Sequence, residues 1–217
     1  GYNEGAMYAG LLQDVKLVRF TDLDANYIQE IVATVDVGSS INAEDTTKAH
    51  TIVAIGGYSS DYHRVIPIAS KIIQGIEHTQ IIKEAEDFLF PYWVKFHNKF
   101  TNILIDNVET KLISTWRSHS RWGGMITVRG CIKTIKDVCP DLSTRASIKA
   151  QLMMKGDLYP NSRIIWVDPE MLKAHRQILQ DKKTGAELDQ ADIWQDYADC
   201  LSYLILWRIK RIIKDKT

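Results

Sequence analysis

Two aspartates stand in apolar stretches of the sequence, where a charge is costly unless it is paired or bound. Asp36 interrupts the run IVATVDVGSS at residues 31–40, whose β-branched and apolar residues predict a buried strand. Asp106 stands near the end of a second apolar run, NILIDNV at residues 102–108. An ionised carboxylate in a protein core is normally paired or bound to a metal. The two runs therefore predict functional acids at the ends of two buried strands, and Gly38 allows a turn or the close approach of a ligand after the first.

Further acids follow in the predicted last helix, at residues 191–213. Asp192, Asp196 and Asp199 have the spacing i, i+4, i+7, which places them along one face of that helix. Taken alone, this spacing is also explained by a solvated helix face with favourable negative charge near the helix N-terminus.

A shared site follows when the strands and the helix are considered together. In an open sheet the carboxyl ends of the strands frame the binding crevice, and a late helix packed across that edge would bring Asp196 or Asp199 to Asp36 and Asp106. Three or four carboxylates at one place need a hard cation, and oxygen ligands suit Mg²⁺ or Mn²⁺. Two such ions about 4 Å apart activate water and stabilise the leaving oxygen in phosphodiester cleavage.

The elements that position these acids begin with three predicted strands. Apolar runs at residues 31–40, 50–58 and 64–73, joined by a polar loop at 39–49 and a short turn, predict an antiparallel meander. Pro67 in the third run indicates an edge position or a bulge.

A predicted helix at residues 78–98 leads to the fourth strand at 102–108, and Pro91 is expected to kink or split that helix. A helix followed by a strand implies a crossover connection, so the fourth strand should run parallel to the first. The remaining expected elements are an edge strand at 15–20, a short strand at 125–128, a helix capped by Ser143 or Thr144 that ends at 154, a fifth strand at 163–167 and a helix at 169–180.

Composition limits the classes of protein that remain. The 217 residues carry 27 basic and 27 acidic side chains, so a whole-molecule field that steers DNA is absent and any nucleic-acid site depends on local charge. No apolar run reaches the length of a membrane span, and no signal peptide is visible, so we expect no membrane association. The three cysteines show no CxxC spacing, which favours a reducing compartment and small buried thiols. The chain begins without a methionine, and we expect it to be a fragment or a processed product.

Local positive charge gathers in an irregular segment that follows the fourth strand. Arg117, Arg121, Arg129 and Lys133 stand there with two tryptophans, which is typical of residues that grip phosphates and stack on bases. A solvated basic loop with core tryptophans is the alternative explanation. Lys149 and Lys155 are expected to be ordinary surface residues.

The order of these elements resembles the ribonuclease H-like superfamily, and more narrowly the nuclease domain of tailed-phage terminase large subunits. The matching segments are VATVDVGSS…EDTTKAHTIVAIGGY, ILIDNV, RASIKAQLMMKGDLYPNSRIIWVDPEMLKAHRQILQ and ADIWQDYADCLSYLILW. The resemblance covers residues 30–207 and implies a mixed five-stranded α/β sheet, with an antiparallel meander and parallel strands, flanked by helices. It also implies that residues 1–30 are a lead-in from an upstream ATPase or linker region and that residues 31–217 are the nuclease domain.

The resemblance assigns roles position by position. Asp36 matches the catalytic aspartate of the first strand, Asp106 the acid of the fourth strand, and Asp199 the aspartate of an Asp-Ala pair in which Cys200 replaces the alanine. Asp196 matches an acid three residues earlier, and Asp45 an accessory acid of the first hairpin. An acid that often precedes Asp196 in the family is Gln195 here, so the choice between Asp196 and Asp199 as metal ligand stays open.

The function implied by the resemblance is cleavage of double-stranded concatemeric viral DNA during genome packaging, with low sequence specificity and two Mg²⁺ or Mn²⁺ ions. The implied partners are DNA, the terminase ATPase domain, the portal and the small terminase subunit. The implied location is the host cytoplasm at the procapsid, outside the mature virion. This chain has no GxxxxGK[ST] segment and should not hydrolyse ATP by itself.

Three other interpretations of the sequence remain. Another ribonuclease H-like nuclease, such as a junction resolvase or an RNA–DNA hybrid nuclease, would share the acids. A nucleotide-binding module of the actin-like kind shares Asp-x-Gly before a hairpin but needs a second glycine-rich phosphate loop. A non-catalytic DNA-binding domain of the same fold would have no reason to hold Asp36, Asp106 and Asp199 together.

Overall fold

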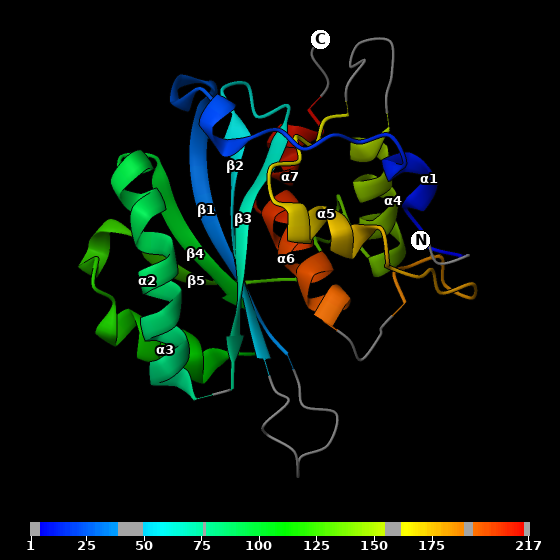
Figure 1. Ribbon diagram of the computed structural model, residues 1–217. Coiled ribbons are helices and arrows are strands. Elements are labelled where there is room, and N and C mark those ends of the chain that lie inside the picture. The colour runs from blue at the N-terminus through cyan, green and yellow to red at the C-terminus, as the bar shows by residue number, and fades with distance from the viewer. Residues whose placement is uncertain (1–4, 39–49, 76, 155–161, 189–192, 215–217) are drawn as a thin grey trace.

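A five-stranded mixed sheet forms the centre of the molecule (Figure 1). The computed structural model describes residues 5–38, 50–75, 77–154, 162–188 and 193–214. The strands lie in the order β3-β2-β1-β4-β5. Their bounds are β1 (Ile28–Val37), β2 (His50–Ser59), β3 (Val65–Gln74), β4 (Phe100–Asp106) and β5 (Thr127–Cys131).

The strand directions agree with the sequence prediction. β1, β2 and β3 form the antiparallel meander, and β4 runs parallel to β1 after the crossover helix. β5 extends the sheet parallel to β4. Pro67 lies on the edge strand β3, where the β2–β3 register shifts next to it, so both parts of the expectation for this proline hold. Its missing N–H costs nothing at such a position.

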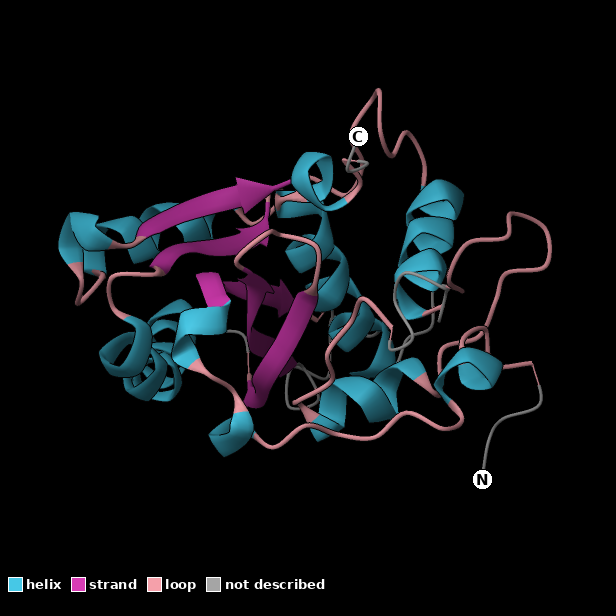
Figure 2. Ribbon diagram, turned by 90° about the horizontal axis from the view of Figure 1, so that it is seen from above, coloured by secondary structure: helices cyan, strands magenta, loops and turns pink. Residues whose placement is uncertain are grey.

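Helices cover both faces of the sheet, as the two views of the ribbon show (Figures 1 and 2). One face carries α2 (His78–Phe96) and α3 (Thr110–His119). The other carries the long helix α6 (Ile193–Trp207), against which α5 and α4 pack. The short and flanking helices are α1 (Ala9–Leu12), α4 (Leu142–Met153), α5 (Pro169–His175), α7 (Ile209–Ile212) and the 3₁₀ turns Phe20–Asp22, Ala25–Tyr27 and Gly123–Met125.

Alternation along the central strands builds one core on each side of the sheet. Val32 and Leu104 point toward α6, whereas Val35 and Ile105 point toward α2 and α3. Because side chains alternate along a strand, Asp36 falls on the α6 side, together with Val32. The period of the strand therefore decides which layer of helices can complete a site with Asp36.

Several expected elements differ from the structure. Residues 163–167 form no strand of the sheet: Ile164 makes a single bridge to Val65, and the fifth strand is β5. The backbone N–H groups of residues 167 and 168 both donate to the carbonyl of Pro67, so the regular hydrogen-bond pattern of a strand does not continue along the edge of β3. Residues 15–20 form no edge strand; only the Val18 backbone N–H donates to the carbonyl of Trp166.

The helices also differ from the prediction in their caps, ends and continuity. α4 is capped by the side chain of Asp141, which accepts from the Thr144 N–H, and not by Ser143 or Thr144. The last helix is divided, because Arg208 leaves helical geometry (φ −122°, ψ 22°) between α6 and α7. α5 ends at His175, earlier than expected. α2 runs through Pro91 without being split.

Within the described ranges, no helix combines the length and the apolar character needed to cross a membrane.

Candidate metal and nuclease site

The parallel pairing of β1 with β4 places Asp36 beside Asp106. Val35 of β1 is in register with Ile105 of β4, and each aspartate is the next residue of its strand. Both side chains are buried, with 7% and 5% of the residue exposed. The two acids predicted from separate apolar runs thus share one edge of the sheet on the α6 side.

α6 brings three more polar side chains to this edge. Asp196, Asp199 and Tyr203 are spaced by three and four residues and so share one helix face. The Tyr203 hydroxyl lies 3.3 Å from Oδ1 of Asp36 and 3.2 Å from Oδ2 of Asp106. These residues, together with the two strand acids, are called the acid site below.

Burial and neighbouring charges shift the pKa values of Asp36 and Asp199. Burial raises the pKa of Asp36 well above its ordinary value, and the negative charges of Asp199 and Asp196 add to the increase. A hydrogen bond between the Asp36 and Asp196 carboxyls, which requires a shared proton, acts in the same direction. Burial also raises the pKa of Asp199, although the Arg145 guanidinium opposes it. The structure therefore concentrates negative charge that is only partly neutralised by the protein.

Two cationic side chains lie against the acids. Nζ of Lys133, a half-exposed residue, lies 3.3 Å from Oδ2 of Asp106, and Nη2 of the buried Arg145 lies 2.7 Å from Oδ1 of Asp199. Burial lowers the pKa of Lys133, but the carboxylates of Asp199 and Asp106 outweigh it and the pKa rises. Both cations are therefore charged at neutral pH.

The donor set fits a hard divalent cation in chemistry, although the side chains are not arranged as ligands. In the described part of the chain, no three His, Cys, Asp or Glu groups are placed so that they could hold one metal ion. Oxygens of Asp106 and Asp199 instead contact Lys133 and Arg145. The donors that meet here are carboxylate oxygens, which Mg²⁺ and Mn²⁺ prefer. Burial is the main cause of the raised pKa of Asp36, and the negative charges of Asp199 and Asp196, which a cation would offset, add to it.

His50 is a member of the site that sequence reasoning missed. Its Nε2 lies 2.5 Å from Oδ2 of Asp196, and its carbonyl accepts from the Gly38 N–H. The six histidines showed no ligand spacing, but the hairpin offered a signal: antiparallel pairing places the first residue of β2 beside the end of β1. Tyr203 was missed because a tyrosine in an apolar helix is indistinguishable from core material.

Gly38 is required by close packing. A Cβ built at this position would lie 2.7 Å from the carbonyl oxygen of His50 and 3.0 Å from Oδ2 of Asp196. The glycine therefore serves the close approach of β2 and α6 to the end of β1.

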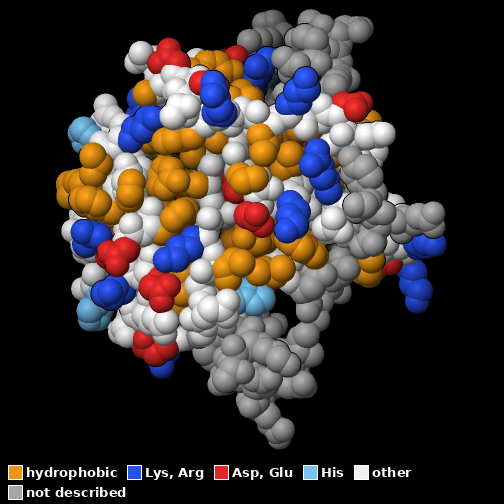
Figure 3. Space-filling view, in the orientation of Figure 1, with side chains coloured by type: hydrophobic (Ala, Val, Ile, Leu, Met, Phe, Trp, Pro, Cys, Tyr) orange, Lys and Arg blue, Asp and Glu red, His pale blue; other side chains and the backbone are white. Residues whose placement is uncertain are grey.

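The four predicted DNA-contacting residues fall on two sides of the sheet. Lys133 reaches Asp106, and Arg129 lies over the ring of Trp207 at the end of α6, 5.8 Å from its centroid. Arg121 instead pairs with Asp87 of α2 and lies 4.4 Å from the Phe90 ring centroid, and Arg117 donates to the carbonyl of Val128. On the face drawn in Figure 3, apolar side chains gather over α2, and the basic and acidic side chains are scattered among them.

His119, in the basic segment, is on an exposed face of α3, where its ring contacts the carbonyl of Thr115. Lys149 is not a surface residue: only 1% of it is exposed. Cys139 and Cys200 are buried and Cys131 is half-buried, and all three are free thiols. Asp45, Asp192 and Lys155 lie outside the described residues.

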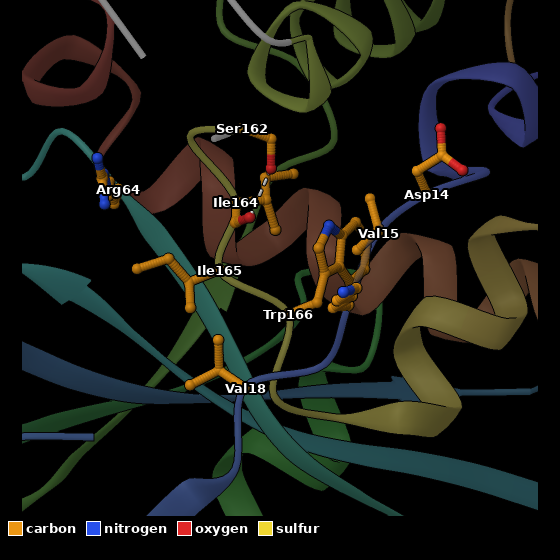
Figure 4. A pocket seen from close by; sticks show the side chains of 9 residues that line it. Asp14, Val15, Val18, Arg64, Ser162, Ile164, Ile165 and Trp166 are labelled. Atoms are coloured by element: carbon orange, nitrogen blue, oxygen red, sulfur yellow. Dashed lines mark hydrogen bonds between the residues drawn. The ribbon is translucent and has the colours of Figure 1, made fainter. Parts of the chain in front are cut away.

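A cavity of about 370 Å³ lies apart from the acid site, between the N-terminal segment and residues 162–166 (Figure 4). Ile164 and Trp166 line it on one side, and Val15 of the N-terminal segment lies beside Trp166. Because none of the acids discussed above lines it, this cavity adds nothing to the site.

The sequence matches no protein-family model and no curated protein. Solved structures are similar. The large terminase of a thermophilic bacteriophage superposes with a TM-score of 0.62 at 14% identity, over 96% of this chain and 46% of that one. The large-terminase (g2p) nuclease domain of bacteriophage SPP1, solved with bound Mn, gives 0.56 at 13% identity, over 90% and 97%. The human cytomegalovirus terminase nuclease domain gives 0.51 at 8% identity, over 97% and 98%.

These likenesses concern the fold. This chain spans about half the length of the thermophilic phage's large terminase, and it is covered almost end to end by the separate nuclease domains. The identities are low, but the antiparallel meander, the crossover to a parallel β4 and the late helix agree with the architecture predicted from the sequence. The chain therefore has the ribonuclease H-like fold of the terminase nuclease domains, with a mixed five-stranded sheet flanked by helices.

Proposed function

We propose that this chain is a divalent-metal-dependent endonuclease domain that cleaves double-stranded DNA during viral genome packaging. The observation that carries the proposal is the convergence of Asp36, Asp106, Asp196 and Asp199, from β1, β4 and α6, at one edge of the sheet. Four neighbouring carboxylates destabilise a folded protein through their mutual repulsion, and a bound cation removes that repulsion.

In this proposal Asp36 is the central metal ligand, with Asp106 and Asp199 as further ligands and Asp196 beside them. A pair of Mg²⁺ or Mn²⁺ ions would supply an activated water and stabilise the leaving oxygen of a phosphodiester. Tyr203 orients the Asp36 and Asp106 carboxyls through its hydroxyl, and His50 does the same for Asp196. Asp45 remains a proposed accessory ligand.

Lys133 and Arg129 are proposed to contact the DNA backbone. They lie on the α6 side of the sheet, where Lys133 contacts Asp106 and Arg129 lies over the ring of Trp207 at the end of α6. A duplex bound at the acid site would bring its phosphates to this side. Phosphate contacts of this kind position a duplex without reading its sequence, which agrees with low sequence preference.

The Mn-bound SPP1 nuclease domain and the large terminase of the thermophilic phage motivate the wider part of the proposal. In it, the domain acts beside an ATPase domain, with the portal and the small terminase subunit as partners, at the procapsid in the host cytoplasm. A junction resolvase, a hybrid nuclease and a non-catalytic DNA-binding domain are the competing functions.

The test is nicking of supercoiled plasmid in Mn²⁺ by the parent chain and by Asp36→Asn, Asp106→Asn and Asp199→Asn. Each variant is expected to lose nicking at least about a hundredfold, with an unchanged circular dichroism spectrum, because each removes a charged ligand. Full activity of all three variants would contradict the assignment of these aspartates as metal ligands. Parallel assays on linear duplex, branched DNA and RNA–DNA hybrid separate the competing nucleases, and an inactive parent with intact DNA binding favours the non-catalytic domain.

A further inference from the structure

A buried ionic cluster lies directly behind the acid site. Lys149 and Arg145, one helical turn apart on α4, point toward α6 and meet the carboxylate of Glu187. Nζ of Lys149 lies 2.5 Å from Oε1 of Glu187, and Nη2 of Arg145 lies 3.7 Å from its Oε2. Arg145 also contacts Asp199 at 2.7 Å, so this residue joins the cluster to the acid site.

The cluster is balanced in charge and almost fully buried. Arg145 and Lys149 contribute two positive charges, and Glu187 and Asp199 contribute two negative charges. The exposed fractions of the four residues range from 1% to 9%. In such a low-dielectric setting an unbalanced charge acts strongly on its neighbours, so removing one member changes the field at the others.

Neutral groups complete the cluster without changing its charge. The Tyr8 hydroxyl donates to Oε1 of Glu187 at 2.7 Å, and Lys149 also reaches the carbonyl of Ala198 at 3.0 Å. The His175 ring contacts the carbonyl of Met171 through Nδ1 and faces Lys149 with Nε2. Burial, reinforced by Lys149, lowers the pKa of His175 to about 3, so that ring is neutral at pH 7.

Glu187 is held in this place by local backbone pairing. Leu188 N–H donates to the carbonyl of Leu179, and Gln180 bridges to Glu187. The N-terminal segment pairs with the same strip, since Met7 N–H donates to the carbonyl of Ile178. The carboxylate of Glu187 faces Arg145 and Lys149 and not the strand acids, so Glu187 is not placed to be a metal ligand itself.

We propose that Glu187 is a positioning residue for the acid site: by neutralising Arg145 and Lys149, it prevents their positive charges from opposing a divalent cation at Asp199. The inference rests on the proposed function, in that it takes the acid site to bind such a cation. Without Glu187, the guanidinium of Arg145 would pair with Asp199 alone. The cluster would then carry one positive charge in excess, which would repel the cation. Both effects weaken metal binding.

The test is calorimetric titration of the whole chain with Mn²⁺ at pH 7.5, without DNA. Glu187→Gln is expected to raise the Mn²⁺ dissociation constant about tenfold or more, within the range of about 10–100-fold that outer-shell substitutions cause. Glu170→Gln removes the same charge from an exposed position on α5 and is the matched control, with an unchanged constant. Tyr8→Phe removes only a hydrogen bond to Glu187, so its effect should stay below about threefold.

A double variant separates charge from structure. Arg145→Gln combined with Glu187→Gln removes one charge of each sign, so Mn²⁺ affinity should return to within about threefold of the parent if net charge dominates. If the double variant binds as weakly as Glu187→Gln, Glu187 acts through packing and the inference is overturned. If Glu187→Gln does not fold, Arg145→Gln is compared with the double variant, and the chain that keeps Glu187 should bind Mn²⁺ about tenfold more tightly.

The outcomes for the two proposals are distinct. A parent chain that binds Mn²⁺ and a folded Glu187→Gln variant that binds equally well overturn the role of Glu187 and leave the metal site intact. A parent chain that does not bind Mn²⁺ at millimolar concentration removes the basis of both.

Discussion

The hydroxyl oxygen of Tyr203 lies 3.2 Å from Oδ2 of Asp106 and 3.3 Å from Oδ1 of Asp36. One side chain of α6 therefore contacts the acids of both central strands. Its phenol stays protonated, because burial and the neighbouring carboxylates raise its pKa. A single proton donor thus ties together two groups that repel each other.

Replacing Tyr203 with phenylalanine is expected to lower the unfolding free energy in EDTA by about 1–3 kcal/mol, because the carboxyls lose a buried donor. Urea unfolding measures the change. Saturating Mn²⁺ should reduce the difference between variant and parent, since a cation takes over the partnering of the same oxygens. An equal loss with and without Mn²⁺ contradicts the placement of Tyr203 at a metal site.

Adding a methyl group at Gly38 should disturb the acid site directly. The new Cβ of Gly38→Ala would lie 2.7 Å from the backbone oxygen of His50, so β2 must move, at a cost of about 1–3 kcal/mol. We expect a lower melting temperature and reduced nicking. Gly124→Ala, where no atom lies within 4 Å of the added Cβ, is the control and should change neither.

Acid stability should depend on Glu187. Burial raises its pKa, but Lys149 and Arg145 outweigh burial and lower it to about 2 from an ordinary value of 4.5. A lowered pKa means that the stabilisation is complete above pH 4.5 and is lost as the pH falls toward 2. The full loss is on the order of 3 kcal/mol. The stability difference between parent and Glu187→Gln, from urea unfolding in EDTA, should therefore shrink between pH 5 and pH 3; a constant difference speaks against this ion pair.

Charge reversal should have different effects on DNA binding at Arg129, on the side of the acid site, and at Arg121, on the opposite face of the sheet. Arg129→Glu is expected to weaken plasmid binding and to lower the salt dependence by about one phosphate contact, because Arg129 lies on the side of the acid site. Arg121→Glu is expected to have little effect, because Arg121 is paired with Asp87 on the opposite layer. Binding is measured in Ca²⁺ across a salt series. Equal losses from both variants would show that DNA contacts both faces of the sheet.

The sequence by itself determined the layers of this fold and the strand acids. β-branched runs with period two predict strands, an amphipathic helix before a strand predicts a crossover, and a carboxylate in an apolar run is costly enough to be noticed. For these reasons β1, β4 and the late helix, with Asp36, Asp106, Asp196 and Asp199, are recognisable in the amino-acid sequence alone.

Tertiary structure alone decided the contacts among distant segments. Lys149 and Glu187 have the composition of surface residues, and only their pairing in the core, 38 residues apart, makes their burial possible. The contacts of His50 and Tyr203 were likewise set by neighbours far along the chain, and so was the pairing with β4 that makes the short strand expected at 125–128 the fifth strand, β5. The local sequence determines which helix or strand a residue prefers, because that preference depends on near neighbours in the chain. The partner that neutralises a buried charge is brought in by packing between elements, which the local sequence does not reveal.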